Sequence, residues 1–217
     1  RVDGTGHVTG LKKGTATVTA YELVGGRKFQ ADPVTFTVTD QSIGTVTAVK
    51  VLAKDLTVKN PSDGGYSVSG DSVTIKAMGQ GLWATQTANN VIVSGENVNR
   101  GDGTFTAIVK MSGKTVNNWD EAGLFIYKDD DNYVAVERKH GTNSPKVHVV
   151  TEANGSANED QNTENPNAEA IWLKLEKSGN TFTGYCSVDK ENWTKVGNSI
   201  TNDKIGNSFG VALVAGT

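Results

Sequence analysis

The chain has 217 residues and a formal net charge of −3, so it offers no basic field that would attract nucleic acid or anionic lipid. No apolar run approaches the roughly 18 to 20 residues that a membrane-spanning helix requires, and we expect no membrane insertion. The single cysteine, Cys186, excludes an internal disulfide framework. It alternates in phase with apolar neighbours, which predicts a small buried core residue.

The first 40 residues show an alternating pattern with glycine between its parts. Threonine alternates with apolar residues over 15–20 and again over 34–38, and Gly25-Gly26 lies between the two runs. This pattern predicts an antiparallel hairpin. A short strand is expected before it, around His7 to Thr9.

The run VDGTGHVTGLKKGTATVTA at 2–20 resembles the second half of the group 2 bacterial immunoglobulin-like domain. The first strands of that family's sandwich would precede Arg1, so the resemblance implies a partial domain over 1–40. Half a sandwich exposes an apolar face and a strand edge, and we expect it to lean on the following domain or on another chain. Since the chain starts at Arg1 without a methionine, we also expect a longer polypeptide whose targeting signal lies outside it.

A short connector is expected over 41–47, and the strand pattern resumes at Ala48. We therefore place a second domain at 45–217, whose length suits an all-β sandwich of more than ten short strands. The polar segment 152–169 has no apolar anchor and predicts a long loop.

Three runs rich in aromatic and β-branched residues predict a β-meander within this domain, at 122–127, 133–139 and 147–150. Leu124 and Ile126 fall on one face of the first strand, and Phe125 and Tyr127 fall on the other. We expect the first face to pack against a second sheet and the other face to remain available to a ligand.

Several motifs occur in a fixed order along this domain. They are GQGLW at 79–83, GDGTFTAIV at 101–109, WDEAGL at 119–124, NYVAVER at 132–138 and AIWLKLEKSGNTFTGYCSVDKENWTKVG at 170–197. The ordered set resembles the concanavalin A-like, laminin G-like sandwich appended to secreted bacterial glycoside hydrolases. The resemblance implies an all-β, concanavalin-like (jelly-roll) β-sandwich, preceded here by the small immunoglobulin-like fragment.

This chain departs from the family pattern at two places. The aspartate that commonly follows the first tryptophan is absent after Trp83, and the aspartate-glycine turn of the last motif is replaced by Asp189-Lys190-Glu191. Binding chemistry that the family places at those positions is therefore not carried over to this chain.

Sugar rings stack their flat apolar face on exposed aromatic rings, while fixed polar groups bind the hydroxyls. Alternation places Leu173, Leu175 and Phe182 on the core side, so Trp172 and Tyr185 should share the outward face and lie near one another. The other predicted carbohydrate-binding residues are Trp83, Trp119, Tyr127, Glu137, Arg138 and His148. For Trp83, Trp119 and Trp193, which lie near strand ends and turns, capping of the core is the interpretation that we favour. For Trp172, packing beneath a loop is the alternative to a ligand role.

A catalytic centre is not indicated. Concanavalin-like enzymes that cleave glycans place carboxylates at alternating positions of one strand, so that they point into the same cleft. No such spacing occurs here, because Asp120 and Glu121 are adjacent and therefore belong to opposite faces.

Calcium is the one cofactor that the sequence suggests. Asp129 and Asp131 lie in a run of hard oxygen ligands, but the run lacks the glycine and the downstream glutamate of the helix-loop-helix calcium site. A solvated turn between strands is the interpretation that we favour. The three histidines are too scattered to form a metal triad.

These observations favour a non-catalytic carbohydrate-binding module of a secreted or surface-attached bacterial glycoside hydrolase. Its partners would be a glycan, either a polysaccharide or a host or mucin oligosaccharide, and the flanking domains of the same polypeptide. The alternative is a structural or adhesive module of a cell-surface protein with no sugar ligand. A hydrolase that uses an unrecognised carboxylate pair is a further rival.

Overall fold

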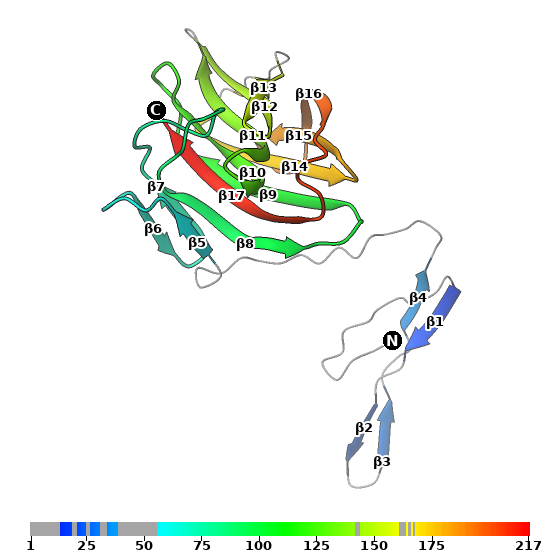
Figure 1. Ribbon diagram of the computed structural model, residues 1–217. Helices are drawn as coiled ribbons and strands as arrows, with labels where there is room; N and C mark the ends of the chain where they lie inside the picture. Colours follow the sequence, from blue (N-terminus) through cyan, green and yellow to red (C-terminus); the bar gives the residue numbers. More distant parts are fainter. Residues whose placement is uncertain are drawn as a thin grey trace. The chain divides into compact units, whose positions relative to one another are not determined.

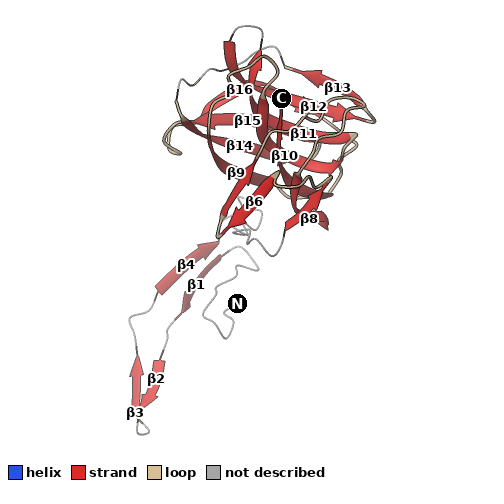
Figure 2. Cartoon of the chain, turned by 90° about the vertical axis from the view of Figure 1, so that its left-hand side faces the viewer, coloured by secondary structure: helices blue, strands red, loops and turns tan. Residues whose placement is uncertain are grey.

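The computed structural model describes residues 14–18, 21–24, 27–30, 34–38, 56–141, 144–160, 164, 166 and 168–217. All regular elements among these residues are strands (Figure 2). This part of the chain accordingly contains no helix long and apolar enough to cross a membrane. The chain divides into two compact units, residues 1–45 and 46–217, which are described separately.

The first unit contains two antiparallel strand pairs. Strand β1 (Gly14–Val18) pairs with β4 (Val34–Val38), and β2 (Tyr21–Val24) pairs with β3 (Arg27–Gln30). The predicted strand around His7 to Thr9 lies outside the described residues. The immunoglobulin-like character of residues 1–40 stays a prediction.

The second unit is built from two antiparallel sheets (Figure 1). The larger sheet has seven strands in the order β13-β12-β11-β10-β17-β8-β5, and the smaller sheet has four in the order β16-β15-β14-β9. The strands of the larger sheet are β5 (Leu56–Lys59), β8 (Val91–Asn99), β10 (Glu121–Asp129), β11 (Asn132–Gly141), β12 (Ser144–Ala153), β13 (Ser156–Glu159) and β17 (Ser208–Gly216). Those of the smaller sheet are β9 (Phe105–Ser112), β14 (Ala170–Ser178), β15 (Thr181–Ser187) and β16 (Thr194–Thr201). A separate hairpin consists of β6 (Tyr66–Ser69) and β7 (Ser72–Ile75).

The two sheets pack face to face around one apolar core. Leu124, Val136 and Val149 from the larger sheet meet Leu173 and Phe182 from the smaller one, and all five are buried. Burial of each such side chain contributes about 1.5–3 kcal/mol to folding. The predicted all-β sandwich and its central meander, which pairs β10 with β11 and β11 with β12, are confirmed.

A second apolar core lies on the opposite face of the larger sheet, where the sequence predicted a surface open to a ligand. Phe125, Tyr127 and Tyr133 are at most 2% exposed there and pack with Leu82 and Ala88. The Tyr133 hydroxyl donates a hydrogen bond to the Leu82 carbonyl oxygen at 2.6 Å. The expected open face is therefore wrong, because the segment before β8 covers this part of the sheet.

The segment 152–169 is only partly the long loop that its polarity predicted. Its first residues complete β12 and form β13, which pairs back on β12. The turn between them is Asn154-Gly155, with φ angles of 51° and 73°. Asparagine and glycine are the residues that tolerate this left-handed conformation in a tight hairpin.

Strand β15 approaches the opposite sheet closely at Gly184. A Cβ atom on this residue would lie 2.6 Å from Val149 Cγ2 and 3.3 Å from Val136 Cγ2. Two residues further along, Cys186 is buried in the same core, as predicted, and burial raises the pKa of its thiol to about 11. The spacing of the two sheets thus depends on small side chains along this strand.

We expect Gly184→Ala to lower the free energy of unfolding by about 1–3 kcal/mol, because the added methyl group overpacks the space between the sheets. Urea unfolding of the two proteins would measure the difference. The matched control is Gly103→Ala, since a Cβ atom there meets nothing within 4 Å and the change should stay within about 0.5 kcal/mol. Equal stability of the Gly184 variant and the parent chain would contradict this description of the core.

Candidate functional site

The outward face of the smaller sheet carries three half-buried aromatic rings. Trp172 lies on β14, Tyr185 on β15 and Trp193 in the turn before β16. In the register of β14 with β15, Trp172 is opposite Ser187 and Tyr185 is opposite Lys174. Trp172 and Tyr185 therefore share this face as diagonal neighbours. We call this face the aromatic surface, defined by Trp172, Tyr185, Trp193, Lys110, Lys174, Glu176 and Lys190.

Lys174 occupies the centre of the aromatic surface. Its Nζ atom lies 4.0 Å from the centre of the Tyr185 ring and 4.8 Å from that of Trp193. The same atom is 3.0 Å from Glu176 Oε1. Cation–π contacts of exposed lysines contribute about 0.5–1 kcal/mol each, so the two rings and the carboxylate together hold this ammonium group in one place.

The Trp172 ring is approached by two further ammonium groups. Lys110 Nζ lies 5.8 Å from the ring centre, and Lys190 Nζ lies 4.6 Å from it. Lys110 comes from β9, where it is the register partner of Trp172, whereas Lys190 comes from the turn after β15. Two different elements thus bring positive charge to the same ring.

Asp189 organises the turn that carries Lys190. Its carboxylate accepts hydrogen bonds from the backbone N–H groups of Glu191 and Asn192, both at 2.8 Å, and from the Asn192 side-chain amide at 2.7 Å. The Ser187 hydroxyl also donates to it, at 2.9 Å. The hydrogen bond from the Asn192 side chain contributes most to lowering the pKa of Asp189, and the other bonds act in the same direction. The turn is therefore held by its own residues before any ligand arrives.

The predicted exposure of Tyr127 is wrong. Tyr127 belongs to the covered face of β10 and is 1% exposed, with its hydroxyl donating to the Asp130 carboxylate. Burial and this hydrogen bond raise the pKa of Tyr127. A ring in this position has no free face on which a sugar could stack.

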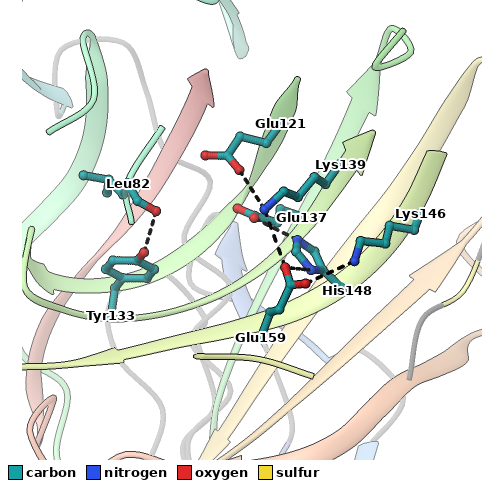
Figure 3. A network of polar contacts seen from close by, with 8 residues as sticks. All are labelled: Leu82, Glu121, Tyr133, Glu137, Lys139, Lys146, His148 and Glu159. Carbon is teal, nitrogen blue, oxygen red and sulfur yellow. Dashed lines mark hydrogen bonds and ion pairs between the residues drawn. The ribbon is translucent and has the colours of Figure 1, made fainter. Parts of the chain in front are cut away.

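Glu137 and His148 are also buried, in a polar network at one end of the larger sheet (Figure 3). His148 Nε2 lies 2.9 Å from Glu137 Oε1, and His148 Nδ1 lies 3.1 Å from Glu159 Oε2. Lys139 Nζ bridges Glu159 Oε2 at 3.5 Å and Glu121 Oε2 at 3.7 Å. The charges compensate one another within the sheet, so the expectation that Glu137 points into solvent is wrong.

Two glycines, Gly81 and Gly216, pack closely against one side of this network. A Cβ atom on Gly81 would lie 1.5 Å from Glu121 Oε1, and one on Gly216 would lie 2.3 Å from the Gly81 backbone nitrogen. The GQGLW segment therefore lies directly on the carboxylate and on the end of β17. Its glycines permit this close backbone approach.

Burial shifts the proton affinities in the network. Burial, reinforced by the neighbouring Glu137 carboxylate, raises the pKa of Glu121 to about 8. For His148, burial alone lowers the pKa, but hydrogen bonds with Glu137 and Glu159 outweigh it, so the net pKa is raised. Both groups therefore hold protons more tightly than they do in an unfolded chain.

Arg138 serves the scaffold instead of a ligand. It is 4% exposed, and its guanidinium donates hydrogen bonds to the carbonyl oxygens of Gly113 at 2.7 Å, Pro166 at 3.2 Å and Ala168 at 2.5 Å. This side chain therefore joins the loop after β9 to the segment before β14.

Trp83 and Trp119 both lie near Lys139, a member of the buried network. The Nζ atom of Lys139 lies 5.3 Å from the centre of each ring. Trp83 is half-buried, which agrees with the capping interpretation, whereas Trp119 is 61% exposed and has a left-handed φ of 76°. The loop of Trp119 is fixed by Asp120, whose carboxylate accepts backbone hydrogen bonds from Val116 and Asn117.

Asp129 and Asp131 lie in the hairpin turn between β10 and β11. Asp129 Oδ1 accepts hydrogen bonds from the Asp131 backbone N–H at 3.1 Å and from the Asn132 amide at 2.7 Å. Within the described ranges, no group of three or more His, Cys, Asp or Glu residues could hold a metal ion. The Asp129 oxygen therefore supports the turn, and the choice between a solvated turn and a calcium site stays a prediction.

The sequence reasoning left Trp193, Lys110, Lys174 and Lys190 out of the predicted site. The signal for Lys174 was available, since it alternates with Leu173 and Leu175 and so belongs to the outward face. Lys110 and Lys190 could be assigned only once the register of β9 with β14 and the path of the turn were known.

The two-layer sandwich is the architecture of concanavalin A-like domains. The family model described as the beta xylosidase C-terminal concanavalin A-like domain matches residues 101–212, which is more than half of the chain. The chain belongs to this family. The predicted concanavalin-like fold is thus confirmed, and the family is one of accessory domains of glycoside hydrolases.

Solved structures share the fold at low identity. The GH43 protein BlXynB from Bacillus licheniformis has a TM-score of 0.64 at 18% identity, and the match covers 77% of this chain and 34% of that one. The xylan beta-1,4-xylosidase from Bacillus halodurans C-125 has a TM-score of 0.62 at 17% identity, with the same two coverages. A functionally unknown protein from Saccharomyces cerevisiae has a TM-score of 0.59 at 20% identity, and the match covers 76% of this chain and 88% of that one. This chain spans about a third of the length of the two Bacillus proteins. A search of curated proteins finds no match.

The raised pKa values in the buried network predict how stability depends on pH. Between the ordinary pKa of Glu121, 4.5, and its folded value of about 8, the folded state binds more protons than the unfolded state. The free energy of unfolding should therefore fall as pH rises through this window, and His148 contributes in the same direction. Urea midpoints at intervals from about pH 5 to about pH 8 would measure the slope.

Glu121→Gln removes one of these titrations and should flatten the slope. Glu191→Gln, at an exposed position of the turn after β15, is the matched control and should keep the slope of the parent chain. An unchanged slope in the Glu121 variant would contradict the proposed proton affinity of the network.

After a chelator has removed any bound metal, titration of the protein with calcium should release no heat. The reason is that Asp129 in the β10–β11 turn already accepts hydrogen bonds within that turn. Isothermal titration calorimetry of the full chain measures this directly. Heat that disappears in an Asp129→Asn, Asp131→Asn variant would overturn the solvated-turn interpretation and establish a calcium site.

Proposed function

We propose that this domain is a non-catalytic carbohydrate-binding module, in which the aromatic surface binds a glycan and keeps a glycoside hydrolase near its substrate. The observation that carries the proposal is the presence of three half-exposed rings, those of Trp172, Tyr185 and Trp193, on one outward sheet face. Burying large rings is favourable, so rings held at a surface suit the binding of a flat apolar partner.

Polar groups stand beside these rings at the positions that sugar hydroxyls would need. Lys174 and Glu176 lie on the same strand face as Trp172, and they form an ion pair with each other. Together they offer donors and acceptors between the rings. A glycan could therefore stack on the aromatic side chains and bond to these two groups at once.

The proposed lack of catalysis is supported by the carboxylates of the larger sheet. Glycoside hydrolysis needs one carboxyl group on each side of an accessible glycosidic bond. Glu121 and Glu137 occupy neighbouring strands, but their side chains are only 13% and 5% exposed and both interact with cations of the network. The GQGLW segment covers Glu121, which leaves no room for a sugar between them.

The parent polypeptide in this proposal is a secreted or surface-attached bacterial glycoside hydrolase. Two observations support it, namely the family of C-terminal beta xylosidase domains to which the chain belongs and the aromatic rings of the smaller sheet. The flanking domains of the same polypeptide would be its protein partners. A weak module suffices in such an arrangement, because linkage to the enzyme raises the local concentration of the glycan.

Binding of the full chain to a panel of plant and host polysaccharides by affinity electrophoresis and calorimetry tests the proposal. We expect Trp172→Ala and Tyr185→Ala each to weaken binding about tenfold or more, which corresponds to about 1.4 kcal/mol of lost stacking. Circular dichroism would verify that both variants keep the fold.

Trp119→Ala is the matched control, because this ring is exposed on the loop beside the larger sheet and outside the aromatic surface. Binding that is lost in Trp119→Ala and retained in the other two variants would move the site to that loop. An absence of binding to every polysaccharide would favour a structural or adhesive module. Release of reducing sugar by the chain would favour a hydrolase.

A further inference from the structure

Lysines outnumber carboxylates on the aromatic surface, although the net charge of the whole chain is −3. On the outward face, the strands of the smaller sheet contribute three lysines and a single carboxylate, that of Glu176. The lysines are Lys110, Lys174 and Lys195. The turn after β15 adds Lys190, together with Asp189 and Glu191.

The carboxylates of this surface are not placed to neutralise all of the lysines. Glu176 forms its ion pair with Lys174, and the Asp189 carboxylate is used by the hydrogen bonds of its own turn. Within the part of the chain that the structure describes, neither Lys110 nor Lys190 forms an ion pair. Two unpaired ammonium groups therefore approach the Trp172 ring from two different elements.

The backbone of Lys190 is the second observation. Its φ angle is 70°, a left-handed conformation that glycine adopts freely and that costs a lysine conformational energy. The Asp189 turn nevertheless holds it there, with the Lys190 backbone N–H donating to the Ser187 hydroxyl at 3.0 Å. The turn thus holds Lys190 in a conformation that places its ammonium group 4.6 Å from the centre of the Trp172 ring.

From this geometry we propose that the glycan bound at the aromatic surface carries uronic acid residues, whose carboxylate is received by Lys110 and Lys190 at the Trp172 ring. This inference rests on the proposed carbohydrate-binding function and names the chemical class of the ligand. The sugar ring contacts the tryptophan, and the carboxylate accepts charge-assisted hydrogen bonds from the two ammonium groups. The ammonium groups are already held near the ring, which reduces the conformational entropy lost on binding.

A matched pair of polymers tests the ligand class. A glucuronic acid-bearing xylan is compared with the same polymer after reduction of its carboxyl groups to alcohols, so that only the charge differs. We expect the full chain to bind the acidic polymer on the order of tenfold more tightly than the reduced polymer, as two exposed ion pairs would allow. The difference should shrink as salt is added, because exposed charges are screened.

The variants Lys190→Gly and Lys110→Gln test the assignment of residues. Each should reduce the ratio of the two affinities about two- to fivefold. Lys190→Gly should also keep or raise the thermal midpoint of unfolding, since glycine suits the left-handed position. A misfolded variant would lose affinity and thermal stability together, so the two results distinguish a lost contact from misfolding. Lys76→Gln removes an equal charge outside the aromatic surface and should leave the ratio unchanged.

The outcomes separate this inference from the proposed function. Equal affinity for the acidic and the reduced polymer overturns the uronic acid assignment and leaves carbohydrate binding intact. Equally tight binding of dextran sulfate, which has sulfate groups and no uronic acid, also overturns it and indicates a general affinity for polyanions. An absence of binding to any polymer refutes the proposed function and this inference together.

Discussion

The central strands of the larger sheet, β10 and β11, are buried on both of their faces, and this constraint leaves their side chains inaccessible to a ligand. One face packs on the smaller sheet through residues such as Leu124 and Val136, and the other is covered through Leu82 and Ala88. Burial of both faces explains why β10 and β11 read as nearly continuous apolar runs. The outward face of the smaller sheet differs, because half-buried rings alternate there with polar side chains.

The same constraint explains the polar network at the end of the larger sheet. Charged groups that are withdrawn from water must find partners within the protein. Glu121, Glu137 and Glu159 are matched there by His148 and by two lysines, Lys139 and Lys146. These residue types would suit a ligand site if they were exposed. Their mutual contacts and their glycine cover make them part of the scaffold.

Much of the fold could be predicted from the sequence, because strand alternation is a local property. It assigned Leu124 and Ile126 to the inner face of β10, and it placed Trp172 and Tyr185 together on the outward face of the smaller sheet. The sequence also contains a signal for the β12–β13 hairpin. Asn154-Gly155 is the turn pair that favours a tight hairpin, but the polarity of the surrounding residues suggested a loop.

The rest could not be predicted, because it depends on contacts between residues far apart in the chain. Alternation shows that Tyr127 and Glu137 lie on the second face of the meander, but not that the segment before β8 covers that face. The approach of Lys190 to Trp172 likewise depends on the path of one turn. The sequence shows only that lysine follows Asp189 in this turn, and not that its ammonium group lies over the ring.

Arg138 has a consequence for how this end of the sandwich moves. Its guanidinium is bonded to carbonyl oxygens on both the loop after β9 and the segment before β14. If either one detached alone, a buried cation would lose part of its hydrogen bonding, which is energetically expensive. The two segments should therefore open together as one cooperative unit of local unfolding, so that slow fluctuations at this edge are shared between parts of the chain more than fifty residues apart.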